Sequence, residues 1–286
     1  MEVLVIGGSG LVGSNIVEKA HDLDADVAAT YHENPVDHTD IELDKTDAET
    51  TQQVVTDVAP DLIVDTAAFH DVDACETHRD QAWTVNPTGT RNVATAANSV
   101  DAHLVYLSTD YVFPGDPDDA PYTETDPVAP LNYYAETKYA AEQAAKIADT
   151  STILRPSVIY GLASPNFVTW VLGELRDGEE VGIVDDQTSA PTYAVDLAHA
   201  CLEVYQNELT GLYHATGPQS VSRYEFTETL AQVYGFDTDL VQPISTEELG
   251  QDAPRPEDST LDSSRLYESI EYRFSSPEDA FAKMRE

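Results

Sequence analysis

A tyrosine and a lysine four residues apart are the side chains best suited to proton transfer. Tyr134 and Lys138 lie in an alanine-rich stretch, YAETKYAAEQAA, and on a helix they share one face. A tyrosine holds its proton up to about pH 10, and a nearby ammonium group lowers that pKa by favouring the phenolate. We therefore expect Lys138 to lower the pKa of Tyr134 and to make it an acid for a carbonyl oxygen. The alternative without a catalytic role is a tyrosine packed on the helix beside a surface lysine.

The position of this pair favours the chemical interpretation. Thr109 directly follows HLVYLS (103–108), an apolar run typical of a buried parallel strand. Open parallel sheets bind ligands outside the carboxyl ends of their strands, where we expect Thr109, Tyr134 and Lys138 to converge. The Thr109 hydroxyl would then hold a substrate carbonyl in line while Tyr134 supplies a proton and a nicotinamide supplies a hydride.

A glycine-rich turn provides a place for such a cofactor. GGSGLVG (7–13) lies between the apolar segment VLVI and a helical pattern. In this context the glycines allow a tight turn and a close approach of backbone to pyrophosphate, which sits on the free N–H groups of the helix start. We expect Gly7, Gly10, Leu11 and Gly13 to bind a dinucleotide, the alternative being an ordinary glycine-rich turn.

The end of the second expected strand bears on the choice between NADP and NAD. NAD sites usually place an acid there, whereas this strand ends in Thr30, Tyr31 and His32. The absence of an acid permits a 2′-phosphate, held by Thr30 and His32, so we lean weakly to NADP although no arginine is near. Asp44 is expected either to bind the adenine amine or to be a solvated acid.

Short apolar strands alternating with helices predict the fold. We expect strands at 1–6, 26–30, 62–65, 103–108 and 152–155, and helices at 11–20, 48–58, 81–97 and 133–148. This order predicts an α/β fold with a doubly wound, parallel, Rossmann-type sheet over 1–160. A looser pattern, with strands at 181–184 and 211–215 and helices at 167–176, 195–205, 223–234 and 277–284, predicts a smaller, mainly substrate-binding C-terminal lobe over 161–286, with some elements returning to the first domain.

Composition excludes several classes of protein. The chain carries 14 Lys and Arg against 53 Asp and Glu, a formal charge of −39, which argues against nucleic acid and anionic membranes as partners. No apolar run approaches the ~20 residues of a membrane span. Two cysteines, Cys75 and Cys201, and a core strand at residues 2–6 favour a cytoplasmic protein. The eight histidines show no metal-ligand spacing, so we expect no metal.

Longer motifs carry a resemblance that covers nearly the whole chain. TAAFHDVDACE (66–76), VNPTGTRNVA (85–94), STDYVF (108–113), YAETK (134–138) and LRPSVIYG (154–161) resemble the extended short-chain dehydrogenase/reductases. Within that family STDYVFPG, APTYAVDLA (190–198) and RPEDSTLD (255–262) are most similar to the dTDP-4-dehydrorhamnose reductases.

The resemblance assigns roles to residues at the matching positions. It implies that Thr109, Tyr134 and Lys138 are catalytic, with Lys138 also holding the cofactor ribose. Asn86 would position helices. The remaining residues that it places at the cofactor are Ala67, Ala68, Ser108, Pro156 and Ser157. The residues that we expect at the substrate are Tyr111, Phe113 and Arg255, the arginine facing the pyrophosphate.

One position separates reaction types. Related dehydratases carry an Asp–Glu pair after the threonine, whereas here Asp110 and Tyr111 follow Thr109, so carbonyl reduction is favoured. We expect NAD(P)H-dependent reduction of a 4-keto nucleotide-sugar in deoxysugar or polysaccharide biosynthesis. Val158, where an aromatic residue is common, and Asp65, where asparagine is common, leave the sugar open. The alternatives are an epimerase of the same fold and a non-catalytic subunit like the regulatory subunit of methionine adenosyltransferase. A homodimer also stays open.

The charge generates a prediction about environment. A chain this acidic repels itself in dilute buffer, whereas at 1 M salt the screening length falls to about 3 Å. We expect a protein of a salt-rich, halophilic cytoplasm, whose unfolding temperature rises steeply between about 0.1 and 3 M salt. Thermal unfolding across that range measures this, and an unfolding transition unchanged by salt would contradict it.

Overall fold

A seven-stranded parallel sheet forms the centre of the larger lobe. The computed structural model describes residues 1–285, and within them the strands run in the order β11-β6-β5-β4-β1-β2-β3. Their bounds are β1 (Glu2–Ile6), β2 (Asp26–Tyr31), β3 (Ile41–Glu42), β4 (Leu62–Asp65), β5 (His103–Leu107), β6 (Ser151–Arg155) and β11 (Gly211–His214). The strand order reverses between β1 and β4, so the predicted doubly wound sheet is confirmed, with its ligand crevice expected at that point.

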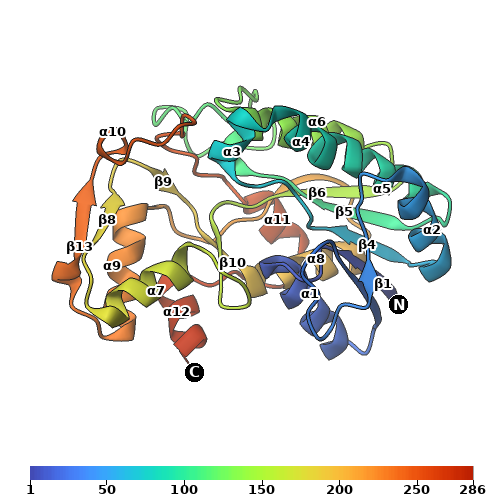
Figure 1. Cartoon of the computed structure of the whole chain (residues 1–286), viewed down its shortest axis with the longest axis horizontal. Helices are drawn as coiled ribbons and strands as arrows, with labels where there is room; N and C mark the ends of the chain where they lie inside the picture. Colours follow the sequence, from blue (N-terminus) through green and yellow to red (C-terminus); the bar gives the residue numbers. More distant parts are fainter. Residues whose placement is uncertain (286) are drawn as a thin grey trace.

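Alternation along β1 explains why helices cover both faces of the sheet. Val3 and Val5 pack in one apolar cluster, and Leu4 and Ile6 pack in another on the opposite face, because successive side chains of a strand point to opposite sides. The first cluster contains α1 (Leu11–Asp22), α8 (Ala194–Gln206) and α11 (Ser264–Ser269). The second contains α2 (Ala48–Val58), α5 (Thr90–Asn98) and α6 (Tyr133–Ala145). Figure 1 shows these helices on the two sides of the sheet.

The helix expected over 81–97 is interrupted in the structure. It consists of α4 (Arg79–Trp83), a π-helical segment (Thr84–Gly89) and α5. Pro87 lies inside the π-helical segment, and since proline has no N–H and its ring clashes with the preceding turn, it disfavours regular α-helix there. Short π-helical segments are frequent at functional sites, and this one contains Asn86.

The smaller lobe has its own core. Strands β8 (Val181–Val184) and β13 (Val241–Ile244) pair in parallel. They pack with α7 (Phe167–Asp177), α9 (Arg223–Tyr234) and α12 (Pro277–Arg285) around Tyr160, Phe226 and Phe281. This lobe lies beside the sheet, at the end opposite the N-terminus (Figure 1). The short elements β3, α3 (Val72–Thr77), β13, α10 (Thr246–Leu249) and α11 were not expected from the sequence.

Elements from the second half of the chain complete the first lobe. β11 pairs with β6 at the sheet edge, and α8 packs in the same cluster as α1. The segment 255–262 runs back along the first lobe, where Leu261 bridges Tyr122. Returning elements were part of the predicted domain division, which itself stays a prediction. None of the helices within residues 1–285 has the length and apolarity needed to cross a membrane.

Candidate active site

The two hydroxyl side chains expected to act on a carbonyl come together. Tyr134 occupies the first turn of α6, which begins after Asn132, whose side chain accepts a hydrogen bond from the Ala135 N–H. Thr109 follows β5, and its hydroxyl, which donates to Asp110 at 3.1 Å, lies close enough to Tyr134 to lower the pKa of the phenol. Tyr134 is only half buried, and the ring of Tyr111 lies edge-on to it at 6.3 Å. Tyr134 is therefore not part of the closed core, although its phenol is desolvated enough to raise its pKa.

The expected effect of Lys138 on Tyr134 is wrong. Burial raises the pKa of Tyr134, the nearby Thr109 hydroxyl opposes that shift, and Lys138 is not among the groups that lower it. The Lys138 ammonium instead donates to the Leu107 carbonyl at 2.6 Å and lies 4.5 Å above the Tyr106 ring. Tyr134 consequently keeps its proton at neutral pH, so it can act as a proton donor and is not a phenolate.

Lys138 itself is perturbed by its surroundings. Its side chain is buried, and burial lowers its pKa to about 7, with a further contribution from the positive charge of Lys45. Asp65 and Glu142 oppose this shift. A lysine this easily deprotonated is characteristic of an active site, although structural ion-pair networks produce the same effect.

The glycine turn has the geometry of an anion site. Gly7 has φ +84°, which glycine adopts without strain, and a Cβ at Gly13 would lie 2.2 Å from the Gly7 carbonyl oxygen. Gly10 caps α1 without a side-chain hydrogen bond, and the first turn, which starts at Leu11, carries no acidic residue in a chain with 53 of them. The helix start therefore presents free N–H groups and positive potential, which fit a pyrophosphate.

Residues around this turn divide into supporting and exposed ones. The Thr30 hydroxyl accepts a hydrogen bond from the Gly7 N–H, so it holds the turn. His32 is exposed and lies 4.0 Å from the Asp44 carboxylate. His38, which the sequence analysis missed, has Nε2 3.0 Å from the Gly8 carbonyl oxygen, and no local motif distinguishes it from other loop histidines.

A buried carboxylate fixes the loop that carries Thr109. Asp110 accepts hydrogen bonds from the hydroxyls of Ser157 and Ser259, both at 2.6 Å, and from Thr109 at 3.1 Å. Its N–H donates to the Pro156 carbonyl. Burial raises the pKa of Asp110, and the three hydroxyl donors oppose that shift. The Ser157 side chain thus donates to Asp110, and its expected contact with the cofactor stays a prediction.

A second buried carboxylate supports the other side of β5. Glu142 accepts a hydrogen bond from the Ser108 hydroxyl at 2.6 Å and two from Arg155 at 2.7 and 2.8 Å. Ser108 is 5% exposed, so its side chain is committed to this network. The ion pair joins α6, which carries Tyr134 and Lys138, to the carboxyl end of β6.

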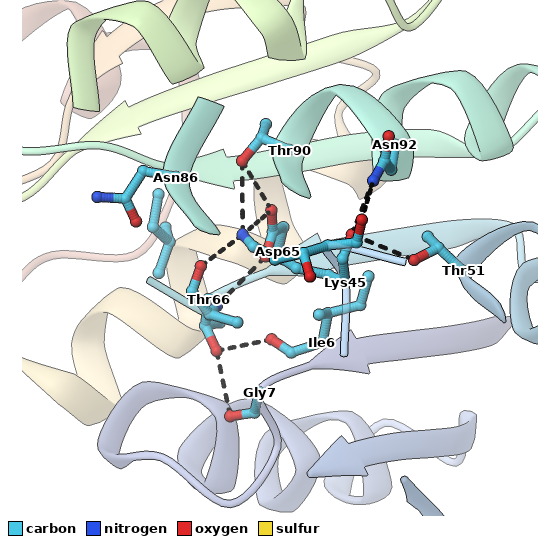
Figure 2. Close-up of polar contacts among 12 residues, drawn as sticks. Ile6, Gly7, Lys45, Thr51, Asp65, Thr66, Asn86, Thr90 and Asn92 are labelled. Atoms are coloured by element: carbon cyan, nitrogen blue, oxygen red, sulfur yellow. Dashed lines mark hydrogen bonds and ion pairs between the residues drawn. The ribbon is translucent and has the colours of Figure 1, made fainter. Parts of the chain in front are cut away.

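The charged residue that the sequence analysis missed altogether is Lys45. Its ammonium lies 2.8 Å from Asp65 and donates to the Ala67 carbonyl at 2.5 Å. Thr90 donates to the same carboxylate, and Asn92 donates to the Lys45 carbonyl. Figure 2 shows these groups gathered at the end of β4. Asp65, which stands where asparagine is common in the family, is therefore paired with Lys45. The sequence alone did not predict this pairing.

The same cluster reaches the glycine turn. The Thr66 hydroxyl donates to the carbonyls of Ile6 and Gly7 at 2.9 and 3.2 Å (Figure 2). Ala67 and Ala68, half buried, follow directly. Asn86 donates to the Phe69 carbonyl and to Thr137 on α6. The loop after β4 is thus held between the glycine turn and the helix of Tyr134.

Two neighbouring hollows lie beyond the catalytic residues. An inner pocket is lined by Tyr111, Val158, Gln187, Thr188, Ser189, Arg223, Pro256 and Ser259. An outer cavity is lined by Pro117, Asp186, Gln187, Thr188, Thr246, Arg255, Pro256, Glu257 and Asp258. Gln187, Thr188 and Pro256 line both hollows, so the pocket and the cavity are adjoining parts of one groove.

The three expected substrate residues fall in different places. Tyr111 lines the inner pocket. Arg255 lines the outer cavity, but its guanidinium makes two hydrogen bonds to Asp73. Phe113 is a correction: it is fully buried, stacked on Tyr122 with ring centroids 4.5 Å apart. Its place in the STDYVF motif reflects packing beneath the site and not contact with a substrate.

The perturbed Lys138 generates a prediction about stability and pH. Its pKa falls from 10.5 to about 7 on folding, so between these values the unfolded chain binds more protons and stability rises with pH. We expect this residue to add up to about 1.4 kcal/mol per pH unit to the unfolding free energy. Urea unfolding from pH 7 to about pH 9 measures it. The variant Lys138→Met should lose this slope, and parallel curves for the two proteins would refute the assignment.

The Lys45–Asp65 pair generates a prediction about stability alone. Lys45→Met leaves a buried carboxylate without its cation, which costs about 3–5 kcal/mol of unfolding free energy. Adding Asp65→Asn should recover much of that loss. The matched control is Lys19→Met, which removes a surface ion pair with Asp22. Urea unfolding at fixed salt compares the variants, and equal losses for the two lysines would show that burial of the pair does not matter.

Comparison with known proteins agrees with this geometry. Residues 1–284 match the family described as the RmlD substrate binding domain. The chain is 33% identical over 268 residues to dTDP-4-dehydrorhamnose reductase of Mycobacterium tuberculosis, covering 91% of this chain and 84% of that protein. It is 31% identical over 274 residues to the probable low-salt glycan biosynthesis reductase Agl14 of Haloferax volcanii, covering 93% and 91%.

A solved structure extends the similarity to three dimensions. The crystal structure of dTDP-4-dehydrorhamnose reductase from Bacillus anthracis in complex with NADP superposes with a TM-score of 0.91 at 33% identity, covering 99% of this chain and 98% of that one. The chain therefore belongs to the RmlD substrate binding domain family, within the extended short-chain dehydrogenase/reductases, and is an NAD(P)-dependent oxidoreductase of the dTDP-4-dehydrorhamnose reductase type.

Proposed function

We propose that this protein reduces the 4-keto group of a nucleotide-linked sugar, with Thr109 and Tyr134 acting on the carbonyl oxygen. The observation that carries the proposal is the approach of these two side chains at the carboxyl end of β5, where the Tyr111 N–H donates to the Thr109 hydroxyl and the Tyr111 ring lies edge-on to Tyr134. The free helix start at the glycine turn lies at the carboxyl end of β1 in the same sheet. Two hydroxyls and a dinucleotide site at one edge of a sheet suit carbonyl reduction.

Each residue has a distinct part in the proposed reaction. Tyr134, whose raised pKa keeps it protonated, donates its proton to the carbonyl oxygen as the alkoxide forms. Thr109 orients that oxygen and stabilises its developing charge. Lys138, whose ammonium donates to the Leu107 carbonyl, would hold the ribose of the cofactor. Bound NADPH or NADH would supply the hydride.

Two features favour simple reduction over loss of water. Dehydration needs a carboxylate able to take a proton from the sugar, and the position after Asp110 is Tyr111, which lines the inner pocket. Asp110 itself is 2% exposed and accepts hydrogen bonds from three hydroxyls. Neither residue offers a free base at the groove, so the net reaction consumes one reduced cofactor for each ketone.

We favour NADPH as the physiological reductant. The last residues of β2, Thr30 and Tyr31, include no acid. His38 lies at the Gly8 carbonyl of the glycine turn, and His32 lies 4.0 Å from the Asp44 carboxylate. Imidazoles in these positions would accept a phosphate more readily than a carboxylate would. The relative from Bacillus anthracis is described in complex with NADP, which supports the same choice.

The proposal predicts the effect of removing one oxygen atom. Tyr134→Phe keeps the ring against Tyr111 but lacks the acidic proton, so turnover should fall by about 10²–10⁴-fold. The affinity for NADPH should stay within a factor of about three, because the phenol contributes to proton transfer more than to cofactor binding. Loss of NADPH absorbance with dTDP-4-dehydrorhamnose as the ketone, and fluorescence titration of NADPH, measure the two quantities.

A second variant and the stoichiometry complete the test. Tyr133→Phe, next to Tyr134 on the same helix, is the matched control and should retain turnover. An epimerase would interconvert sugars without net oxidation of NADPH, so consumption of one NADPH for each sugar distinguishes the two activities. Undiminished turnover in Tyr134→Phe would exclude the proposed proton donor.

A further inference from the structure

Arg223 is a half-buried cation without a carboxylate partner. Three arginines in residues 1–285 are buried or half buried: Arg155, Arg223 and Arg255. Arg155 pairs with Glu142, and Arg255 pairs with Asp73. The Arg223 guanidinium makes neither an ion pair nor a hydrogen bond within the described residues, in a protein with 53 acidic side chains. An unmatched cation retained in that setting needs an explanation.

The guanidinium lies at the inner pocket. Arg223 lines it together with Tyr111, and its charge acts on Asp110, directly beneath Thr109. It also lies 5.6 Å above the ring of Phe167, a contact that orients the side chain without using its N–H groups. These donors therefore remain available at the end of the groove nearest the catalytic hydroxyls.

A second polar group in the same pocket also lacks a partner. Ser189 is 4% exposed, and its hydroxyl oxygen has no hydrogen-bond partner in the described part of the chain. Buried polar atoms are almost always paired, so an unpaired hydroxyl beside an unmatched guanidinium indicates a ligand that satisfies both. No sequence motif predicted that Ser189 and Arg223 line this pocket.

Backbone pairing holds these two residues together. Strand β9 (Thr188–Ser189) pairs antiparallel with β12 (Val221–Ser222), and Arg223 follows β12 directly. The Arg223 N–H donates to the Gln187 carbonyl at 3.1 Å. The Thr188 N–H and carbonyl bond in turn to Glu257 and Ser259. The cation thus stands on a rigid support in the inner pocket, bonded through its backbone to Gln187, which also lines the outer cavity.

An anionic ligand in the outer cavity needs this cation, because carboxylates line that cavity. Asp186, Glu257 and Asp258 line that cavity, and its one arginine, Arg255, is already matched by Asp73. A diphosphate placed there would meet carboxylates without a compensating charge. In the adjoining inner pocket Arg223 supplies that charge, and its planar fork suits two phosphate oxygens.

We propose that Arg223, with the Ser189 hydroxyl, binds the diphosphate of the nucleotide-sugar at the inner pocket, on the side where Gln187 and Thr188 connect it to the outer cavity. This inference rests on the proposed function for the identity of the ligand. It places the sugar toward Thr109 and Tyr134 and the nucleoside in the outer cavity. It also reassigns the pyrophosphate contact expected for Arg255 to a different arginine.

Binding of nucleoside diphosphates without a sugar tests this assignment separately from catalysis. Calorimetric titration of the NADP-loaded protein with dTDP and with UDP, at one fixed salt concentration, gives the affinity of the better ligand. Arg223→Met should weaken it roughly 10- to 100-fold, as expected for loss of charge-assisted hydrogen bonds. Arg223→Lys, which keeps the charge but not the fork, should restore part of it. Ser189→Ala should weaken it by less than Arg223→Met.

Controls separate this effect from folding and general charge. Arg91→Met removes an exposed arginine on α5 and should leave the affinity unchanged. Thermal unfolding shows whether Arg223→Met is folded, and Arg223→Gln offers a polar replacement if it is not. In turnover, KM for the nucleotide-sugar should rise much more than kcat falls, since Arg223 touches no reacting atom.

Each outcome bears on the assignment. Unchanged diphosphate affinity in Arg223→Met overturns it. A raised KM with unchanged diphosphate affinity also overturns it, because the arginine would then bind the sugar, for instance a sugar carboxylate. A wild-type protein that binds neither dTDP nor UDP overturns it as well. Loss of diphosphate binding in Arg223→Met, in a protein that shows no reductase activity, would support the diphosphate site and reject the proposed function.

Discussion

Two buried ion pairs hold the strand ends on which the site is built. Lys45 with Asp65 closes the end of β4, and Arg155 with Glu142 joins the end of β6 to α6. Each acid carries a further hydroxyl, from Thr90 or Ser108. Desolvated charges are tolerable only when matched in this way, so neither pair can lose a member without cost. Between them lies β5, whose carboxyl end presents Thr109.

This arrangement explains why some site residues act through others. Ser108 and Ser157 were expected at the cofactor, yet their hydroxyls serve Glu142 and Asp110. They therefore position Thr109 from both sides of its loop. Asp110 draws its third hydroxyl, Ser259, from the C-terminal segment 255–262 that returns to the first lobe, so the position of the catalytic threonine depends on that segment. Catalytic geometry and the packing of the returning segment are thus one network of hydrogen bonds.

The extent to which sequence predicted this site follows the range of the interactions. The glycine turn and the Tyr134–Lys138 pair are local patterns tied to one strand end or one helix, and the structure places both at the expected edge of the sheet. The Lys45–Asp65 pair joins residues 20 positions apart and has no spacing rule. An acid closing the apolar strand LIVD demands a cation, but the sequence does not say which. The pKa of Tyr134 was wrong because burial outweighs a lysine whose ammonium is turned to Leu107.

The site residues of the smaller lobe were the least predictable, because their roles depend on which polar side chains lack a hydrogen-bond or ion-pair partner. Phe113 stands in a recognisable motif and is core, whereas Arg223 stands in no motif and faces the groove. What distinguishes them is burial and partnership, which only three-dimensional structure defines. In a chain this acidic, carboxylates near any cation are abundant, so a guanidinium without one must be kept apart by the backbone. The β9–β12 pairing does this by fixing Arg223 beside Ser189, while Asp73 is paired with Arg255. The carboxylates of the groove repel an anionic ligand, and Arg223 is the place where that repulsion is relieved. The excess of negative charge therefore restricts an anionic ligand to the position of Arg223.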